Sequence, residues 1–251
     1  MEAQYDRICD DLHKAGIRDG MVLMVHSSFR SIGFTAGSPA LVIRALQEVL
    51  TERGTLLMPA LTWATVTREN PVFSVRETPC CVGAIPEAFR QSAGVLRSVN
   101  PVHSVCAWGH YAEELTREHF RDESSLGEHS PYRLLPKYQG KILMLGCGLR
   151  PNTFMHAVEN AACAPYRAPR WQVEYQITDM DGSTRLFHGT LPDMSAYEQR
   201  YDRVSRILSV PELQECDILE AHSYLIDSAA LMEKGVETIR RFPFYFVDKR
   251  S

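Results

Sequence analysis

The chain alternates between short apolar runs and amphipathic segments, and this alternation predicts an α/β fold. Residues 21–25, 55–59 and 141–146 are continuous apolar runs of strand length, which is typical of strands buried on both faces. Residues 2–15 and 38–53 carry apolar positions at helical spacing instead. Because the helix at 38–53 lies between two apolar strands, this unit favours parallel pairing of the strands.

The later part of the chain mixes both patterns. Residues 171–177 alternate between apolar and polar positions, and the D-M-D-G turn at 179–182 precedes a second polar-apolar stretch, as in an antiparallel hairpin. The remaining expectations are helices at 84–92, 111–119, 195–208 and 224–239, strands at 102–108 and 242–248, and a loop at 62–82. We therefore expect one domain, residues 1–251, with a mixed, largely buried central sheet flanked by helices and an antiparallel portion late in the chain.

Composition and charge narrow the function classes. The chain has 251 residues, of which 45% are hydrophobic and 23% charged, as in an ordinary globular protein. Its net charge of -4 and lack of a basic run exclude a typical nucleic-acid-binding surface and agree with a cationic small-molecule partner.

The cysteines and the first residues of the chain indicate the cellular compartment in which we expect the protein. The seven cysteines are odd in number and contain no C-x-x-C, which favours reduced thiols in the cytoplasm. The first residues are polar and acidic, unlike a signal peptide, and no apolar run approaches the roughly 20 residues that span a bilayer. We expect a cytoplasmic protein without a membrane partner.

The loop at 26–37 joins a buried strand to a helix and is a candidate anion site. Backbone N–H groups and the helix dipole in such a loop favour negative charge. Ser27, Ser28 and Ser31 add hydroxyls and Arg30 adds a guanidinium, a set suited to a pyrophosphate. The P-loop motif is absent, and G-F-T-A-G resembles a nucleophile elbow with threonine in place of serine. A plain strand-to-helix turn is the other interpretation.

The segment 152–160, N-T-F-M-H-A-V-E-N, follows a buried strand and opens a helix. Helical spacing places Thr153, His156 and Glu159 on one face, at the edge of the sheet where ligands bind in open α/β folds. A histidine there can act as a general base, and a carboxylate one turn away can fix its tautomer. The alternative interpretation is a solvated helix face with a surface contact between the histidine and the glutamate.

The sequence gives weaker support for a metal site or for a hydrolase. Zinc motifs of the H-E-x-x-H kind are absent, and Asn160 stands where H-x-x-E-H requires a second histidine. We expect no catalytic metal. A Ser/His hydrolase that pairs Ser27 with His156 is an alternative hypothesis, although nothing in the sequence places the two side chains together.

Several segments, taken in order, carry a family resemblance. They are V-H-S-S-F-R-S-I-G at 25–33, G-T-L-L-M-P at 54–59, G-A-I-P-E-A-F-R at 83–90, R-S-V-N-P-V-H-S-V-C-A-W-G at 97–109, H-S-P-Y at 129–132, K-I-L-M-L-G-C-G at 141–148 and N-T-F-M-H-A-V-E at 152–159. This order resembles the aminoglycoside N3-acetyltransferase family, which is distinct from the common acetyltransferase superfamily. The resemblance runs from about residue 10 to the end and is thin after residue 180.

The resemblance implies an acetyl-CoA-dependent enzyme with no metal. His156 would be the catalytic base, Glu159 would orient it or hold a cationic substrate, and Thr153 would lie near the thioester. The residues that would bind coenzyme A are His26, Ser27, Ser28, Arg30, Ile32, Gly33, Ser104 and Val105.

The resemblance further implies transfer to the 3-amino group of an aminoglycoside, and hence a bacterial antibiotic-resistance enzyme that acts as a monomer or homodimer. The chain has Asn100 where the family usually has a histidine, and residues 62–82 and 180–215 follow the family pattern least. We expect those two stretches to bind the acceptor. There are two alternatives. The acceptor is a different amine, or the protein is a module that only binds coenzyme A or cationic antibiotics.

Overall fold

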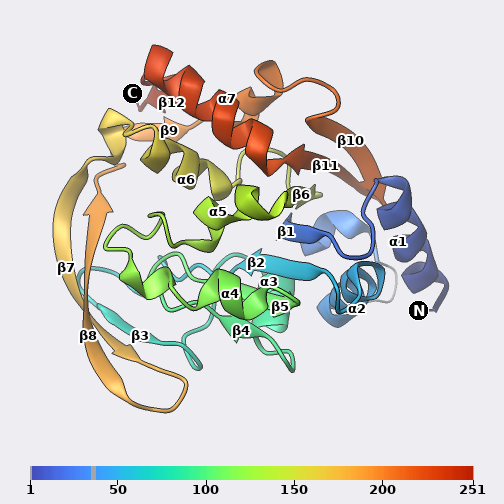
Figure 1. Cartoon of the computed structure of the whole chain (residues 1–251), viewed down its shortest axis with the longest axis horizontal. Helices are drawn as coiled ribbons and strands as arrows, with labels where there is room; N and C mark the ends of the chain where they lie inside the picture. Colours follow the sequence, from blue (N-terminus) through green and yellow to red (C-terminus); the bar gives the residue numbers. More distant parts are fainter. Residues whose placement is uncertain (1, 35–37, 251) are drawn as a thin grey trace.

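The computed structural model describes residues 2–34 and 38–250 and is built on a seven-stranded mixed sheet, with the order β10-β11-β6-β1-β2-β5-β4 (Figure 1). The strands are β1 (Val22–Ser27), β2 (Thr55–Pro59), β4 (Leu96–Arg97), β5 (Val105–Gly109), β6 (Lys141–Leu145), β10 (Leu213–Ile218) and β11 (Ala221–Asp227). β1 pairs in parallel with β2 and β6, and the other pairs are antiparallel. The mixed sheet and the parallel pairing of β1 with β2 are confirmed.

Helices cover both faces of this sheet. They are α1 (Glu2–Lys14), α2 (Pro39–Leu50), α3 (Ala84–Arg90), α4 (Ala112–Thr116), α5 (Pro131–Leu134), α6 (Phe154–Ala161) and α7 (Ser228–Arg241). Short 3₁₀ helices connect them at η1 (Phe29–Ile32), η2 (His119–Arg121), η3 (Leu135–Tyr138), η4 (Pro165–Arg167) and η5 (Tyr201–Arg206). Among the described residues, no helix combines the length and the apolar character needed to cross a membrane.

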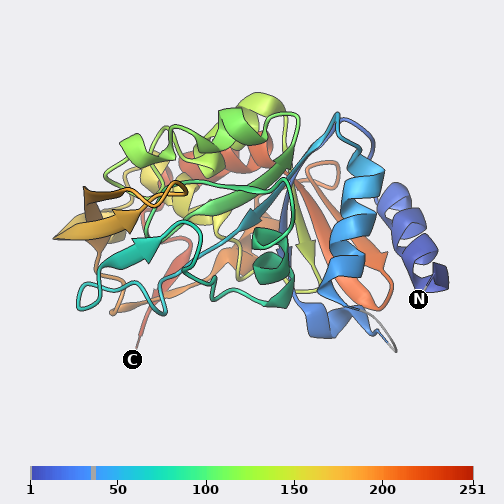
Figure 2. The same ribbon diagram turned by 90° about the horizontal axis from the view of Figure 1, so that it is seen from below.

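The apolar runs are buried on both faces because helices pack on each. Successive residues of a strand point to opposite faces. Accordingly Met24 and Leu57 belong to the core beneath α6 and α7, whereas Leu23 and Val25 belong to the core beneath α1, α2 and α3. Figure 2 shows α1 and α2 lying side by side, away from α6 and α7. This two-sided burial is what the continuous apolar runs predict.

Two smaller sheets extend the domain. β7 (Pro169–Thr178) and β8 (Thr184–Pro192) form the antiparallel hairpin expected from the D-M-D-G turn, and β3 (Val72–Ser74) joins β7 in parallel. This hairpin lies at the end of the molecule opposite α1 (Figure 1). β9 (Tyr197–Gln199) pairs with β12 (Val247–Lys249), the last strand.

Four expectations from the sequence are wrong. The strand expected at 242–248 is reduced to β12, because residues 242–246 form a bend and a turn. Residues 195–208 do not form an α-helix, because β9 pairs with β12 and the chain then turns into η5. The helix expected at 224–239 begins later, since residues 224–227 lie in β11 and the Asp227 side chain caps α7 by accepting from Ala230 N–H. The expected loop at 62–82 contains β3, which long-range pairing with β7 creates.

Close packing of α7 on α6 fixes the helix that carries His156. A Cβ atom on Gly235 would lie 2.6 Å from Val158 Cγ1. We expect Gly235→Ala to lower the free energy of unfolding by about 1–2 kcal/mol, because overpacking outweighs the gain in helix propensity. Urea unfolding checks this. A double-mutant cycle with Val158→Ala should show favourable coupling, and additive effects would contradict direct contact.

Candidate active site

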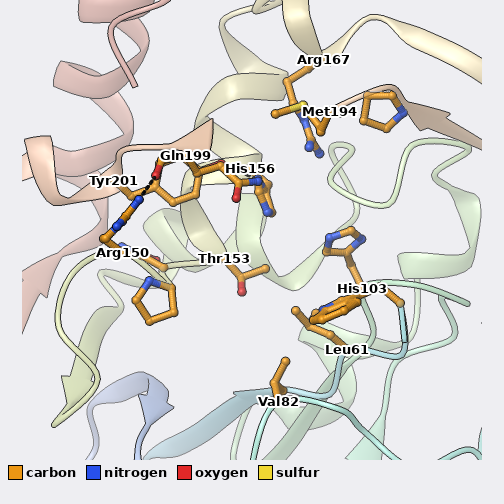
Figure 3. A pocket seen from close by; sticks show the side chains of 14 residues that line it. Leu61, Val82, His103, Arg150, Thr153, His156, Arg167, Met194, Gln199 and Tyr201 are labelled. Atoms are coloured by element: carbon orange, nitrogen blue, oxygen red, sulfur yellow. Dashed lines mark hydrogen bonds between the residues drawn. The ribbon is translucent and has the colours of Figure 1, made fainter. Parts of the chain in front are cut away.

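A cavity of about 480 Å³ opens beyond the ends of β2 and β6, where α6 begins (Figure 3). Three groups of side chains approach it: Arg150, Thr153 and Tyr201 from one side, Leu61, Val82 and His103 from the opposite side, and Arg167 with Met194 from a third. The complete lining is Leu61, Trp63, Val82, His103, Arg150, Pro151, Asn152, Thr153, His156, Arg167, Pro192, Met194, Gln199 and Tyr201. The site lies at the carboxyl ends of parallel strands, as expected for an open α/β sheet.

His156 is held in a defined tautomer by two neighbours. Its Nδ1 lies 3.1 Å from Glu159 Oε2 and 2.7 Å from the Tyr201 hydroxyl. The single Tyr201 hydroxyl proton is donated to Glu159 Oε1 at 2.9 Å. The Tyr201 oxygen must therefore accept from the histidine, so the network assigns the proton to Nδ1. Nε2 is left with a free lone pair on a side chain that lines the cavity, which is the arrangement a general base needs.

The Glu159 carboxylate is completely buried, with a relative exposure of 0%. It also accepts from the Tyr166 hydroxyl at 3.1 Å, and Arg167 Nε lies 3.6 Å from it. A buried charge requires this degree of compensation. The solvated-face interpretation of the helix is thus wrong, and the pairing of His156 with Glu159 is confirmed.

Burial and neighbouring charge favour the neutral form of the site histidines. Burial is the main cause that lowers the pKa of His156, the Arg167 guanidinium lowers it further, and Glu159 opposes both. The ring of His103 packs edge-on against that of His156, with 5.6 Å between the ring centroids. Burial, followed by proximity to His156, lowers the pKa of His103 well below its ordinary value. Both shifts favour the uncharged imidazole at neutral pH.

A third histidine ties the sheet to the start of α6. The backbone N–H of Thr153 donates to His26 Nε2 at 3.0 Å, so His26 carries its proton on Nδ1. Burial lowers the pKa of His26 to about 3. Asn152 Oδ1 accepts from Phe154 N–H at 3.1 Å, directly before the helix. The start of α6 is therefore fixed both from β1 and by this local hydrogen bond.

A narrower cavity of about 80 Å³ adjoins the first, and the two share Val82, Pro151 and Thr153. His26 and Ser27 line it, and the Ser27 hydroxyl is buried with no hydrogen-bond partner within the described structure. Thr153 thus stands between the larger cavity and the loop that follows β1. No hydrogen bond joins Ser27 to His156 among the described residues, so the hydrolase hypothesis gains no support from this geometry.

The rest of the loop after β1 is held by hydrogen bonds and close contacts. Ser28 N–H donates to Leu145 O at 2.9 Å, and the Ser31 hydroxyl donates to that of Ser28 at 2.9 Å. Gly33 has φ 73° in the left-handed region, and a Cβ there would meet the Glu220 side chain at 2.4 Å. Arg30 is exposed, whereas Ile32 is fully buried. Thr35, central to the elbow hypothesis, lies outside the described residues. The cofactor roles of Ser28, Arg30, Ile32 and Gly33 stay predictions.

Ser104 and Val105 lie inside the protein. Both are fully buried, and the Ser104 hydroxyl donates to Ala60 O at 2.7 Å and accepts from Arg97 Nε at 3.0 Å. Their cofactor roles also stay predictions. Asn100, which replaces a family histidine, is buried and accepts from His103 N–H at 2.9 Å, so it shapes the turn that presents His103.

Among the residues that contact the base, its carboxylate or the cavity, sequence reasoning did not single out Trp63, Tyr166, Arg167 and Tyr201. Trp63 and Tyr201 nevertheless lie in the stretches 62–82 and 180–215, which we expect to bind the acceptor, and both line the cavity. Tyr201 lies 45 residues beyond His156 in a stretch that the spacing assigned to an α-helix, so no local signal marks it. Within residues 2–34 and 38–250, no group of three His, Cys, Asp or Glu side chains is arranged to hold a metal ion.

Comparison with known proteins places this geometry in context. A family model described as Aminoglycoside 3-N-acetyltransferase matches residues 24–240. The chain is 34% identical over 182 residues to the SPbeta prophage-derived aminoglycoside N(3')-acetyltransferase-like protein YokD of Bacillus subtilis (strain 168), a match that spans 64% of each protein. It is 32% identical over 212 residues to Aminoglycoside N(3)-acetyltransferase VII of Streptomyces paromomycinus, which covers 76% of this chain and 72% of that relative. The solved structure of AAC-IIIb, binary with CoASH, aligns with a TM-score of 0.82 at 27% identity over 94% of this chain and 96% of that one.

The buried neutral histidines predict acid lability. The unfolded chain binds protons as pH falls through 6.5, whereas His26 and the fully buried His119 hold folded pKa values lowered to about 3 and about 4. Each therefore stabilises the fold above pH 6.5 and loses this contribution at lower pH, by up to about 1.4 kcal/mol per pH unit. We expect the free energy of unfolding, measured with urea, to fall steeply between about pH 6.5 and 4. His119→Gln should flatten this slope, whereas the same change at the exposed His222 should not; parallel slopes would contradict the assignment.

Proposed function

The chain belongs to the aminoglycoside 3-N-acetyltransferase family, and from this premise we propose that it transfers the acetyl group of acetyl-CoA to the 3-amino group of an aminoglycoside. The observation that carries the proposal is the neutral His156 imidazole, held by Glu159 and Tyr201, on the wall of a cavity large enough for a sugar-sized acceptor. The coenzyme A complex of AAC-IIIb supports acetyl-CoA as the donor.

The reaction is a direct transfer. An acceptor amine, which is mostly protonated at neutral pH, enters the cavity and loses a proton to solvent. Its nitrogen attacks the thioester carbonyl and forms the C–N bond while His156 Nε2 takes the second proton. The tetrahedral intermediate then collapses, the C–S bond breaks, and the imidazolium returns its proton to the departing thiolate. No acyl-enzyme is needed.

Glu159 serves this step as a fixed counter-charge. It accepts from Nδ1 throughout, so it orients the imidazole before the attack and stabilises the imidazolium afterwards. The hydroxyls of Tyr166 and Tyr201 and the Arg167 guanidinium hold the carboxylate in place. Because these partners are fixed by the fold, little reorganisation accompanies the proton transfer.

We assign the donor side to the narrow cavity and the loop after β1. Thr153 lies where the two cavities meet, so its hydroxyl is suited to donate to the developing oxyanion or to the thiolate. The buried, unpartnered Ser27 hydroxyl fits a polar group of the coenzyme arm, and the exposed Arg30 guanidinium fits its phosphates.

The first test is thiol release, followed with a chromogenic thiol reagent. Protein and acetyl-CoA are mixed with gentamicin, kanamycin, apramycin and simple amino sugars. We expect release that depends on the acceptor, with product acetylated at the 3-amino group by mass spectrometry and NMR. Binding of acetyl-CoA without release by any amine would favour a module that only binds coenzyme A, and failure to bind acetyl-CoA would reject the proposal.

Removing the base should abolish most turnover. We expect His156→Ala to lower kcat by at least about 100-fold, the contribution typical of a positioned general base. The exposed His188, on β8, provides a matched control, and His188→Ala should leave kcat unchanged. A near-normal rate for His156→Ala would remove this residue from the role.

The pH profile should report the same histidine. The free base is the active form, so kcat/KM, normalised to unprotonated acceptor, is expected to be level above pH 6.5 and to fall at lower pH through the lowered pKa of His156. Since Glu159 raises this pKa, Glu159→Gln should move the acid limb to lower pH and reduce kcat. An unmoved limb would separate Glu159 from the titrating group.

A further inference from the structure

Trp63 is an exposed aromatic residue at the wall of the larger cavity. Its relative exposure is 56%, although most large apolar side chains of the protein are buried. Tryptophan left open on a concave surface commonly marks a binding contact, because its burial by a ligand removes a large apolar area from water.

The turn that carries Trp63 is rigid. Thr62 is fully buried, its N–H donates to Val102 O at 3.1 Å, and its own carbonyl accepts from Val66 N–H at 2.8 Å. Val66 is itself buried in the core beneath β3, β7 and β8. The indole is therefore presented by a fixed backbone, so stacking on it costs little ordering of the turn.

The rest of the wall combines apolar side chains with positive charge. Leu61, Val82 and Met194 are apolar, and the charged side chains among the described lining residues are the guanidiniums of Arg150 and Arg167. Arg150 pairs with Glu198, and Arg167 with the buried Glu159. Arg150 also lies 3.9 Å from Asp202, so each guanidinium is paired with a carboxylate outside the lining. With no carboxylate among the described lining residues, apolar and aromatic contact is what this wall offers a ligand.

We propose that the acceptor-binding surface recognises a ring-borne amine, whose apolar C–H face stacks on Trp63 with the reacting nitrogen toward His156. The inference rests on the proposed acetyl transfer and names how its acceptor is recognised. For an aminoglycoside it means that one ring face supplies binding energy that the ammonium groups alone do not. Trp63 is then a specificity-determining residue.

The test measures thiol release from acetyl-CoA with acceptors that carry either a ring, several ammonium groups, or both. Glucosamine and cyclohexylamine supply a ring with one ammonium group, spermidine supplies several ammonium groups without a ring, and gentamicin supplies both. We expect kcat/KM for both ring monoamines to exceed that for spermidine by about tenfold or more. Their KM should change little between about 50 and 300 mM NaCl, because binding by stacking is not screened.

Variants at Trp63 provide the second arm. Trp63→Ala should raise KM for glucosamine and for gentamicin about tenfold, with kcat and the KM for acetyl-CoA little changed, and Trp63→Phe should restore much of the loss because it keeps a flat ring. Phe242 is a comparably exposed aromatic, at 52%, that does not line the cavity, so Phe242→Ala is the matched control. Circular dichroism checks that each variant is folded.

Each outcome has a defined meaning. Ring monoamines favoured over spermidine, with a KM loss in Trp63→Ala alone, support the inference. It is overturned if spermidine is preferred over the ring monoamines, if KM for ring monoamines rises steeply with salt, or if Trp63→Ala behaves like Phe242→Ala. Thiol release by no amine at all would instead overturn the proposed acetyl transfer, and the inference with it.

Discussion

The buried carboxylate of Glu159 is the constraint on which the rest of the site depends. An ionised carboxylate removed from water costs several kcal/mol unless hydrogen bonds and opposite charge compensate it. Its partners come from three elements: His156 from α6, Tyr166 and Arg167 from η4, and Tyr201 from η5. Formation of the site and burial of the charge are therefore one event, because the carboxylate is satisfied only when all three elements have docked.

This requirement explains why the end of the chain matters to a site near its middle. η5 brings Tyr201 to the histidine, and it is held in turn by ion pairs from Arg200 and Arg203 to Asp248 in the last strand. On the opposite side, the bond from Thr153 N–H to His26 links the start of α6 to β1, in the middle of the sheet. The base is thus located by contacts with both the rigid sheet and the C-terminal segment, which suits a group that must hold its position within a fraction of an ångström.

How far the sequence predicts this arrangement depends on the range of the contacts involved. Strands buried on both faces give continuous apolar runs, so β1, β2 and β6 could be located, and the i, i+3 spacing located His156 beside Glu159. Tyr201 could not be found in this way, because the 195–208 segment has apolar positions at helical spacing while β9 obtains its structure from pairing with β12. Trp63 lies in the stretch 62–82 that we expect to bind the acceptor, but the sequence does not single it out, since its exposure results from a turn anchored by contacts with Val102. Local periodicity reports which face of an element is apolar, and it carries no information on which distant element will cover that face.

The distribution of charge links the base to the choice of acceptor. The negative charge of Glu159 is enclosed behind His156, where it can stabilise an imidazolium but cannot contact a ligand, whereas Arg167 reaches both this carboxylate and the cavity. Arg167 therefore acts twice: it compensates the buried charge and, together with the larger effect of burial, it lowers the pKa of His156, which favours the unprotonated base. Because no carboxylate is among the described residues that line the cavity, the proposed acceptor would draw affinity from uncharged surface, to which the exposed indole of Trp63 contributes.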